Sequence, residues 1–190
     1  ELSHHILDLL ENALQAGASR VSLLIVESSE DNRLLIRLED NGRGMDTETL
    51  ARALDPFFTT RTTRHVGLGL PLLRAAAEQC GGGLTLDSEP GEGTRVEAWF
   101  QLDHIDRAPL GDMVSTLMGA LLSSRAEWDL DYTHQVDGRE IELDTSALRE
   151  VLGDVPVQHP SVRDWLEQVL RQEYKELYSE PAPDGLYDLE

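Results

Sequence analysis

The chain has 190 residues, of which 40% are hydrophobic and 27% are charged, which is typical of a globular protein with one domain or two small ones. The formal net charge of -20 repels phosphate backbones and anionic lipid head groups, so we expect no nucleic-acid partner and no membrane partner. Because no apolar run approaches the roughly 20 residues that cross a bilayer and the N-terminus lacks a signal-peptide pattern, we expect a cytoplasmic protein.

Helical and strand patterns alternate in the first half of the chain. Apolar residues at helical spacing predict helices over about 2–14 and 70–80. Runs of alternating or β-branched residues predict four strands, of which the first two form an antiparallel hairpin. The expected strands are Arg20 to Glu27, Arg33 to Asp40, Leu84 to Ser88 and Thr94 to Leu102.

A short helix and a loop separate the second and third expected strands. Asp46 is the expected N-cap of a helix from about Thr47 to Leu54. Residues 57–65 are aperiodic and follow Pro56, so we expect a mobile loop there.

The second half of the chain has a different pattern. A helix over about 110–122 precedes two strands, 128–136 and 140–143, joined by Asp137-Gly138, a dipeptide that indicates a type I′ turn. Helices over about 145–152 and 162–178 follow. We expect an N-terminal unit over 1–102, a helix-hairpin-helix extension packed on it over 103–178, and an acidic tail over 179–190.

Two glycine-rich segments could hold a ligand. Asp40-Asn41-Gly42-Arg43-Gly44 places a carboxylate at a strand end, where it can accept a hydrogen bond from an exocyclic amine such as adenine N6, and its glycines allow close backbone approach. A plain Asp-Asn-Gly turn explains this motif equally well. Gly67-Leu68-Gly69-Leu70 opens a helix whose unpaired amides suit phosphate oxygens, although a glycine pair before a helix is more often only a connection.

Asp8 and Asn12 lie on one face of the first expected helix. An amide oxygen can ligate Mg2+, and a carboxylate one turn earlier can orient or deprotonate a water. These two residues alone favour the alternative, a solvated polar stripe.

Together and in this order, the motifs resemble those of the GHKL, or Bergerat-fold, ATP-binding superfamily, which includes gyrase, MutL and sensor histidine kinases. The resemblance covers residues 1–102. LENALQAGA resembles the N box, DNGRGM the first glycine box, DPFFTTR the ATP lid, HVGLGL the second glycine box, and Gly93-Thr94 the final glycine-threonine pair. It implies an α/β two-layer sandwich, a mixed sheet with helices on one face, that binds ATP or ADP with Mg2+.

The resemblance also implies roles for single residues. It assigns Asn12 to the metal and Asp40 to adenine. The other cofactor-binding residues that it implies are Gly42, Gly44, Met45, Gly67, Leu68, Gly69, Leu70 and Thr94. We infer Arg61 and Arg64 as lid cations, because the first hundred residues contain no lysine. Asp8 stands where ATPases of the superfamily have a catalytic Glu, and its shorter side chain predicts slow hydrolysis.

The implied function is that of a nucleotide-dependent regulator or kinase-like protein, for which we expect no phosphoacceptor domain of its own. The alternatives are a Ser/Thr protein kinase of anti-sigma type, a histidine-kinase output domain and a slow dedicated ATPase. The stretches DPFFTTRTTRHVGLGLPLLRAAAEQCGG and HIDRAPLGDMVSTLMGALL resemble stand-alone ATP-binding proteins of anaerobic bacteria, whose genes neighbour iron hydrogenase genes. This closer resemblance implies a protein partner, with a hydrogenase or redox-complex component as the candidate.

Overall fold

The computed structural model describes residues 1–55, 69–123 and 128–179. The helices are α1 (Leu2–Gln15), α2 (Thr47–Arg52), α3 (Gly69–Gln79), α4 (Met113–Ser123), α5 (Thr145–Leu152) and α6 (Pro160–Leu177). The strands are β1 (Arg20–Ser28), β2 (Arg33–Asp40), β3 (Gly83–Glu89), β4 (Gly93–Gln101), β5 (Asp129–Val136) and β6 (Arg139–Asp144). Among the described helices, none has both the length and the apolar composition needed to cross a membrane.

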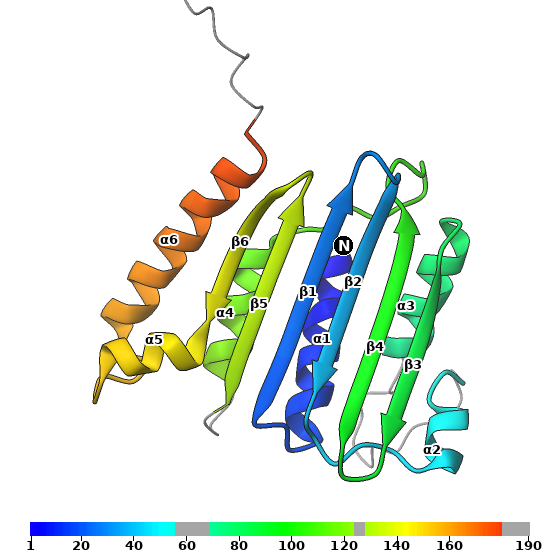
Figure 1. Ribbon diagram of the computed structural model, residues 1–190, viewed down its shortest axis with the longest axis horizontal. Coiled ribbons are helices and arrows are strands. Elements are labelled where there is room, and N and C mark those ends of the chain that lie inside the picture. The colour runs from blue at the N-terminus through cyan, green and yellow to red at the C-terminus, as the bar shows by residue number, and fades with distance from the viewer. Residues whose placement is uncertain (56–68, 124–127, 180–190) are drawn as a thin grey trace, which may run out of the picture.

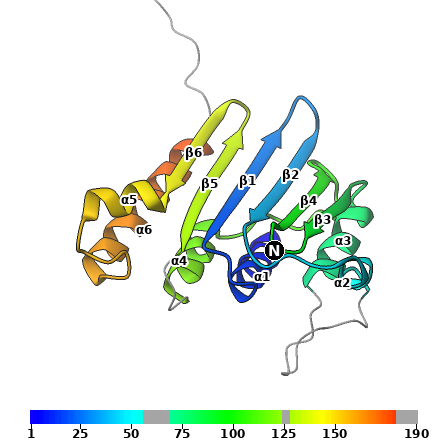
Figure 2. The same ribbon diagram turned by 60° about the horizontal axis from the view of Figure 1, so that its bottom comes forward.

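The strands form one mixed sheet in the order β3-β4-β2-β1-β5-β6 (Figure 1). β1 is antiparallel to β2 and parallel to β5, and the other neighbouring strands are antiparallel. Helices α1, α3 and α4 lie against one face of the sheet (Figure 2). The expected α/β fold, a mixed sheet with helices on one face, is therefore confirmed.

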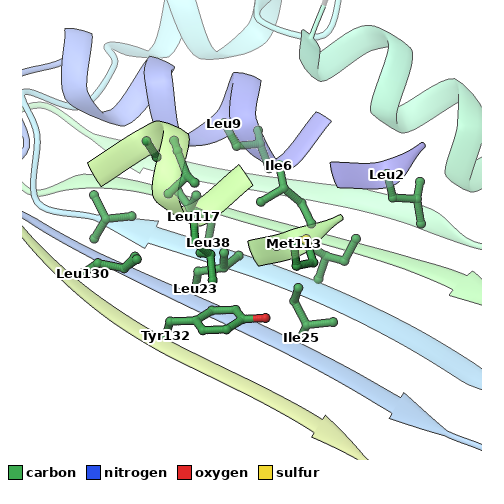
Figure 3. Packing of buried hydrophobic residues seen from close by; sticks show 14 of the residues in the cluster. Leu2, Ile6, Leu9, Leu23, Ile25, Leu38, Met113, Leu117, Leu130 and Tyr132 are labelled. Atoms are coloured by element: carbon green, nitrogen blue, oxygen red, sulfur yellow. The ribbon is translucent and has the colours of Figure 1, made fainter. Parts of the chain in front are cut away.

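The core lies between this helix layer and the sheet (Figure 3). Apolar residues of α1 and α4 point onto alternate residues of the strands, because side chains on one face of a strand recur at every second position. The labelled members of the core are Leu2, Ile6, Leu9, Leu23, Ile25, Leu38, Met113, Leu117, Leu130 and Tyr132. The segment after β4 therefore extends both layers, since α4 packs beside α1 and β5 pairs with β1.

The start of α4 differs most from the expected helix boundaries. The helix begins at Met113, whereas the apolar pattern predicts a start near Leu110. Gly111 has a positive φ of 92°, which is incompatible with a helix. The Asp112 carboxylate then accepts a hydrogen bond from Ser115 N at 2.9 Å, so Asp112 acts as the N-cap.

The turn between β5 and β6 confirms the type I′ prediction. Asp137 and Gly138 both have positive φ, at 47° and 84°, as the two central residues of this turn require. The Asp137 carboxylate also accepts hydrogen bonds from the backbone and hydroxyl of Ser29, both at 2.7 Å. The tip of this hairpin is thereby fixed to the β1–β2 turn.

A buried polar cluster joins α6 to the sheet. His134 is fully buried, with Nε2 3.0 Å from Glu27 Oε1 and Nδ1 3.0 Å from the Tyr174 hydroxyl. Tyr132 bonds the same hydroxyl, and Tyr178 donates to the Glu27 carboxylate. Burial alone would raise the pKa of Glu27, but the hydrogen bonds from His134 and Tyr178 and the nearby positive charges, that of Arg107 among them, together outweigh burial and hold this pKa below its usual value.

The Glu27→Gln variant should therefore lose stability in a pH-dependent way. At pH 7 we expect its free energy of unfolding to fall by about 1.5–3 kcal/mol, the range for hydrogen bonds to charged groups. A carboxyl group whose pKa is lowered by folding stabilises the protein above its unfolded pKa, and this contribution is lost as the pH falls through the folded pKa. Urea unfolding from pH 7 to pH 3 should thus show the gap between wild type and variant closing below about pH 4.5. A gap that stays constant would contradict this role.

Candidate functional site

Three polar residues meet at one edge of the sheet. Asp40 and Ser88 are the last core-facing residues of β2 and β3, and Thr94 is the first of β4. Thr94 is in register with Asp40 on one side and with Ser88 on the other. Figure 1 shows that β2 and β3 end, and β4 begins, at this edge. The core-facing side chains of β2, β3 and β4 are apolar along the strands and polar at this edge of the sheet.

The Asp40 carboxylate is half-buried at this edge. Burial raises its pKa, and the hydrogen bonds from the backbone amides of Gly42 and Thr94 oppose this shift only in part. The distance from Gly42 N to Asp40 Oδ1 is 2.8 Å. A carboxylate has about four acceptor positions, so Asp40 can still accept a hydrogen bond from a ligand.

The glycine-rich turn after Asp40 is fixed to the end of α1. Asn41 Oδ1 accepts hydrogen bonds from the backbone amides of Ser19 and Arg20, both at 2.9 Å, and Asn41 Nδ2 donates to the Ser19 hydroxyl at 3.0 Å. Arg43 N donates to the carbonyl of Ala16 at 2.9 Å. The turn therefore holds a fixed position relative to both β2 and α1.

Gly42 and Gly44 are required by the packing of the chain itself. A Cβ on Gly42 would lie 2.8 Å from both Ala16 Cβ and Asp40 Oδ1. Gly44 has a φ of +65°, and its Cβ would lie 1.9 Å from the carbonyl oxygen of Glu89. The sequence assigned these glycines to close approach of a ligand, but even without a ligand no side chain fits at either position.

Ser88 connects the glycine-rich turn to β4. Its hydroxyl accepts a hydrogen bond from Met45 N at 2.9 Å and donates to the Gly93 carbonyl at 2.7 Å. The same oxygen lies 2.9 Å from Thr94 Oγ1. Ser88 is not among the predicted site residues, although a polar residue at the core-facing end of a strand was the signal that could have found it.

One face of α1 links this edge to the start of α3. Asp8, Asn12 and Ala16 are four residues apart, so they line one face over about 12 Å. The Ala16 carbonyl accepts the hydrogen bond from Arg43 N in the glycine-rich turn. Asn12 lies one helical turn before Ala16. At the other end, a Cβ on Gly69 would lie 3.2 Å from Asp8 Cβ and 3.3 Å from Asp8 Oδ2. The exposed Asp8 carboxylate and the half-buried Asn12 amide therefore lie between the glycine-rich turn after Asp40 and Gly69 at the start of α3.

Oxygen donors near α1 suit a metal that is held only in part by protein. Within residues 1–55, 69–123 and 128–179, no group of three or more His, Cys, Asp or Glu side chains is arranged to hold a metal ion. Mg2+ commonly binds one or two protein oxygens together with water and phosphate oxygens. The Asn12 amide fits such a site.

Of the remaining predicted site residues, the structure describes Met45 and Leu70. Met45 is half-buried, and its backbone amide is bonded to Ser88. Leu70 is partly buried and packs against the hydrophobic core. The expected loop over 57–65 lies outside the described residues, together with four predicted site residues: Arg61, Arg64, Gly67 and Leu68.

In the part of the chain that the structure describes, two of the surface hollows lie away from this edge. The larger, of about 560 Å³, is bordered by Arg33, Trp99 and Gln101 at the opposite ends of β2 and β4. The smaller, of about 280 Å³, lies on α6 beside Trp165 and Val169. The site at Asp40 is thus identified by its converging polar groups and not by the size of a cavity.

The sequence matches to known proteins cover a little more than half of the chain. Residues 1–104 match the family described as histidine kinase-, DNA gyrase B- and HSP90-like ATPase. The sensor protein kinase FleS of Pseudomonas aeruginosa is 45% identical over 106 residues, which are 55% of this chain and 25% of that protein. The sensor histidine kinase ZraS of Escherichia coli is 28% identical over 110 residues, which are 58% of this chain and 23% of that protein. The chain therefore spans a quarter or less of the length of these relatives.

A solved structure resembles more of the chain. The crystal structure of the N-terminal domain of a DNA repair protein superposes on this chain with a TM-score of 0.55 at 15% identity. The superposition covers 83% of this chain and 58% of the chain in that crystal structure. At this identity the likeness concerns the fold alone. It extends beyond the 104 residues that match the family.

Proposed function

The chain belongs to the family of histidine kinase-, DNA gyrase B- and HSP90-like ATPases, and on that premise we propose that it binds ATP or ADP with Mg2+ at the edge formed by β2, β3 and β4. The observation that carries this proposal is the pairing of Asp40 with Thr94 beside a glycine-rich turn that is fixed to α1. A half-buried carboxylate that can still accept a hydrogen bond suits a flat base with an exocyclic amine.

Each group of residues has a separate role in this proposal. Asp40 accepts a hydrogen bond from the 6-amino group of adenine, and Asn12 offers its amide oxygen to Mg2+, which neutralises phosphate charge. The residues that border the base are Gly42, Gly44, Met45 and Thr94. Those on the phosphate side are Arg61, Arg64, Gly67, Leu68, Gly69 and Leu70.

Equilibrium dialysis with labelled ADP tests the proposal. We expect saturable binding in the presence of Mg2+ and weaker binding when a chelator removes the metal, because Asn12 reaches the nucleotide through the ion. Binding that is absent at millimolar ADP would contradict the proposal.

The cellular role that we favour is that of a cytoplasmic nucleotide-dependent regulator or kinase-like protein that acts through a partner protein. The resemblance to proteins encoded beside iron hydrogenases makes a hydrogenase or redox-complex component the candidate partner. Incubation with γ-labelled ATP, alone and with proteins that co-purify, separates the alternatives. Label on the partner indicates a kinase, phosphate release by the chain alone indicates an ATPase, and bound but intact ATP indicates a regulator.

If the chain hydrolyses ATP, Asp8 is the expected general base, since its carboxylate lies beside Gly69 at the start of α3, where a Cβ on Gly69 would meet Asp8 Oδ2 at 3.3 Å. The Asp8→Asn variant should then lose hydrolysis by about 100- to 10,000-fold, the usual contribution of a general base. Its affinity for ADP should stay close to that of the wild type, because the proposed metal ligand is Asn12. Phosphate release and ADP binding measured on the same preparation check this prediction.

Glu11→Gln is the matched control for the Asp8 variant. Glu11 lies next to Asn12 in sequence but points about 100° away around the helix. The Glu11→Gln variant should therefore hydrolyse ATP at the wild-type rate. A loss of activity confined to the Glu11 variant would remove Asp8 from the mechanism.

A further inference from the structure

The Ser88 hydroxyl uses its complete capacity for hydrogen bonds. A serine hydroxyl has one proton to donate and two lone pairs that accept. The proton goes to the Gly93 carbonyl, and one lone pair accepts from Met45 N. The remaining lone pair faces Thr94 Oγ1 at 2.9 Å, so Thr94 must be the donor in that contact.

This arrangement fixes the direction of the Thr94 proton. Because Thr94 donates its one proton to Ser88, its oxygen can only accept a hydrogen bond from a ligand. The neighbouring Asp40 carboxylate also only accepts when it is ionised. The paired ends of β2 and β4 therefore present two acceptors to whatever binds there.

We propose that Ser88 is a positioning residue for nucleotide specificity: by holding the Thr94 proton, it makes this edge select a 6-aminopurine over a 6-oxopurine. This inference rests on the proposed binding of adenine nucleotides at Asp40. An amino group donates to the two acceptors, whereas a 6-oxo oxygen facing them leaves acceptors opposed to an acceptor. A Thr94 hydroxyl released from Ser88 can rotate and donate to that oxygen.

The test compares ADP with IDP, which carries an oxo group where ADP carries the amino group. Dissociation constants are measured by calorimetry for wild type, Ser88→Ala and Ser88→Thr. We expect wild type to prefer ADP, and Ser88→Ala to lower the ratio of the IDP to the ADP constant by about tenfold, the effect of one hydrogen bond. Ser88→Thr restores the hydroxyl and should restore the ratio.

Thr85→Ala is the matched control, because it removes a hydroxyl from an exposed position of the same strand. Its ratio should equal that of wild type. A second control is the Thr94→Val background, in which there is no hydroxyl left to orient. There, Ser88→Ala should change the ratio less than twofold, because the two residues act as one unit.

A merely structural role for Ser88 predicts other results. If Ser88→Ala weakens both nucleotides equally, or if Ser88→Thr fails to restore the ratio, the inference is overturned while the proposed function stands. If wild type binds neither nucleotide, the proposed function falls and the specificity role falls with it.

Hydrogen exchange in the nucleotide-free protein tests the contact itself. Ser88→Ala leaves the Met45 amide without its acceptor, so this amide should exchange several-fold faster than in wild type and in Thr85→Ala. An unchanged Met45 rate would overturn the inference whatever the binding data show.

Discussion

The Asp40→Ala variant should lose the stabilisation that Mg2+ and ADP give to the wild-type protein. At an ADP concentration of about 100 times Kd, wild type should gain about 2.7 kcal/mol in its free energy of unfolding. For a chain of this size the gain corresponds to a rise of about 5–11 °C in Tm. Alanine removes the carboxylate that accepts from the adenine amine, so the variant should show almost no rise. Thermal unfolding at increasing ADP concentration measures the effect.

Asp87→Ala is the control for this experiment. Asp87 is an exposed aspartate on β3, and it precedes the core-facing Ser88, so its side chain lies on the opposite face of the sheet. This variant should keep the full rise in Tm. If Asp40→Ala also keeps the full rise, Asp40 does not contact the nucleotide.

A chain that ends at Leu102 should fail to form a stable monomer. Such a chain lacks β5, which pairs with β1 from Arg20 to Glu27, and it lacks α4, which packs beside α1. It would expose the edge of β1 and the apolar surface of α1 that packs on α4, and both features promote aggregation. Each large apolar side chain that loses its burial costs about 1.5–3 kcal/mol, against a typical total stability of about 5–15 kcal/mol. Size-exclusion chromatography and thermal unfolding check the result.

Point variants separate a packing effect from an effect of chain length. Leu117 is fully buried on α4, so Leu117→Ala should cost about 2–5 kcal/mol. Ile105 is 95% exposed, so Ile105→Ala should change the stability by less than about 0.5 kcal/mol. A truncated chain that is monomeric and as stable as wild type would show instead that residues 1–102 fold independently.

Local patterns were sufficient to predict the helices and strands of the described residues. Apolar spacing and turn residues identify each element, and the Asp137-Gly138 turn was predicted with its type. The order of the strands could not be predicted in the same way. β1 pairs in parallel with β5, which lies about a hundred residues later, and no local periodicity specifies such a distant partner.

The candidate site was predictable only where its residues lie in one motif. The segment from Asp40 to Gly44 carries its turn and its carboxylate in adjacent positions. Ser88 lies near the turn residues Pro90 and Gly91, so its sequence context resembles an ordinary strand end. Its importance depends on its contacts with Thr94, which the pairing of β3 with β4 creates, and with Met45, which the glycine-rich turn after β2 brings to the same hydroxyl.

The placement of the nucleotide at Asp40 is tested most directly by titrating the isotope-labelled chain with Mg2+ and ADP. The NMR signals of the backbone amides are recorded at each step of the titration. We expect saturable shifts at Gly42, Met45 and Thr94, which surround the proposed adenine site. The amides of Trp99, in the larger hollow, and of Trp165, on α6, should not move. Shifts at either tryptophan with none at Gly42 and Thr94 would contradict the placement of the nucleotide at Asp40.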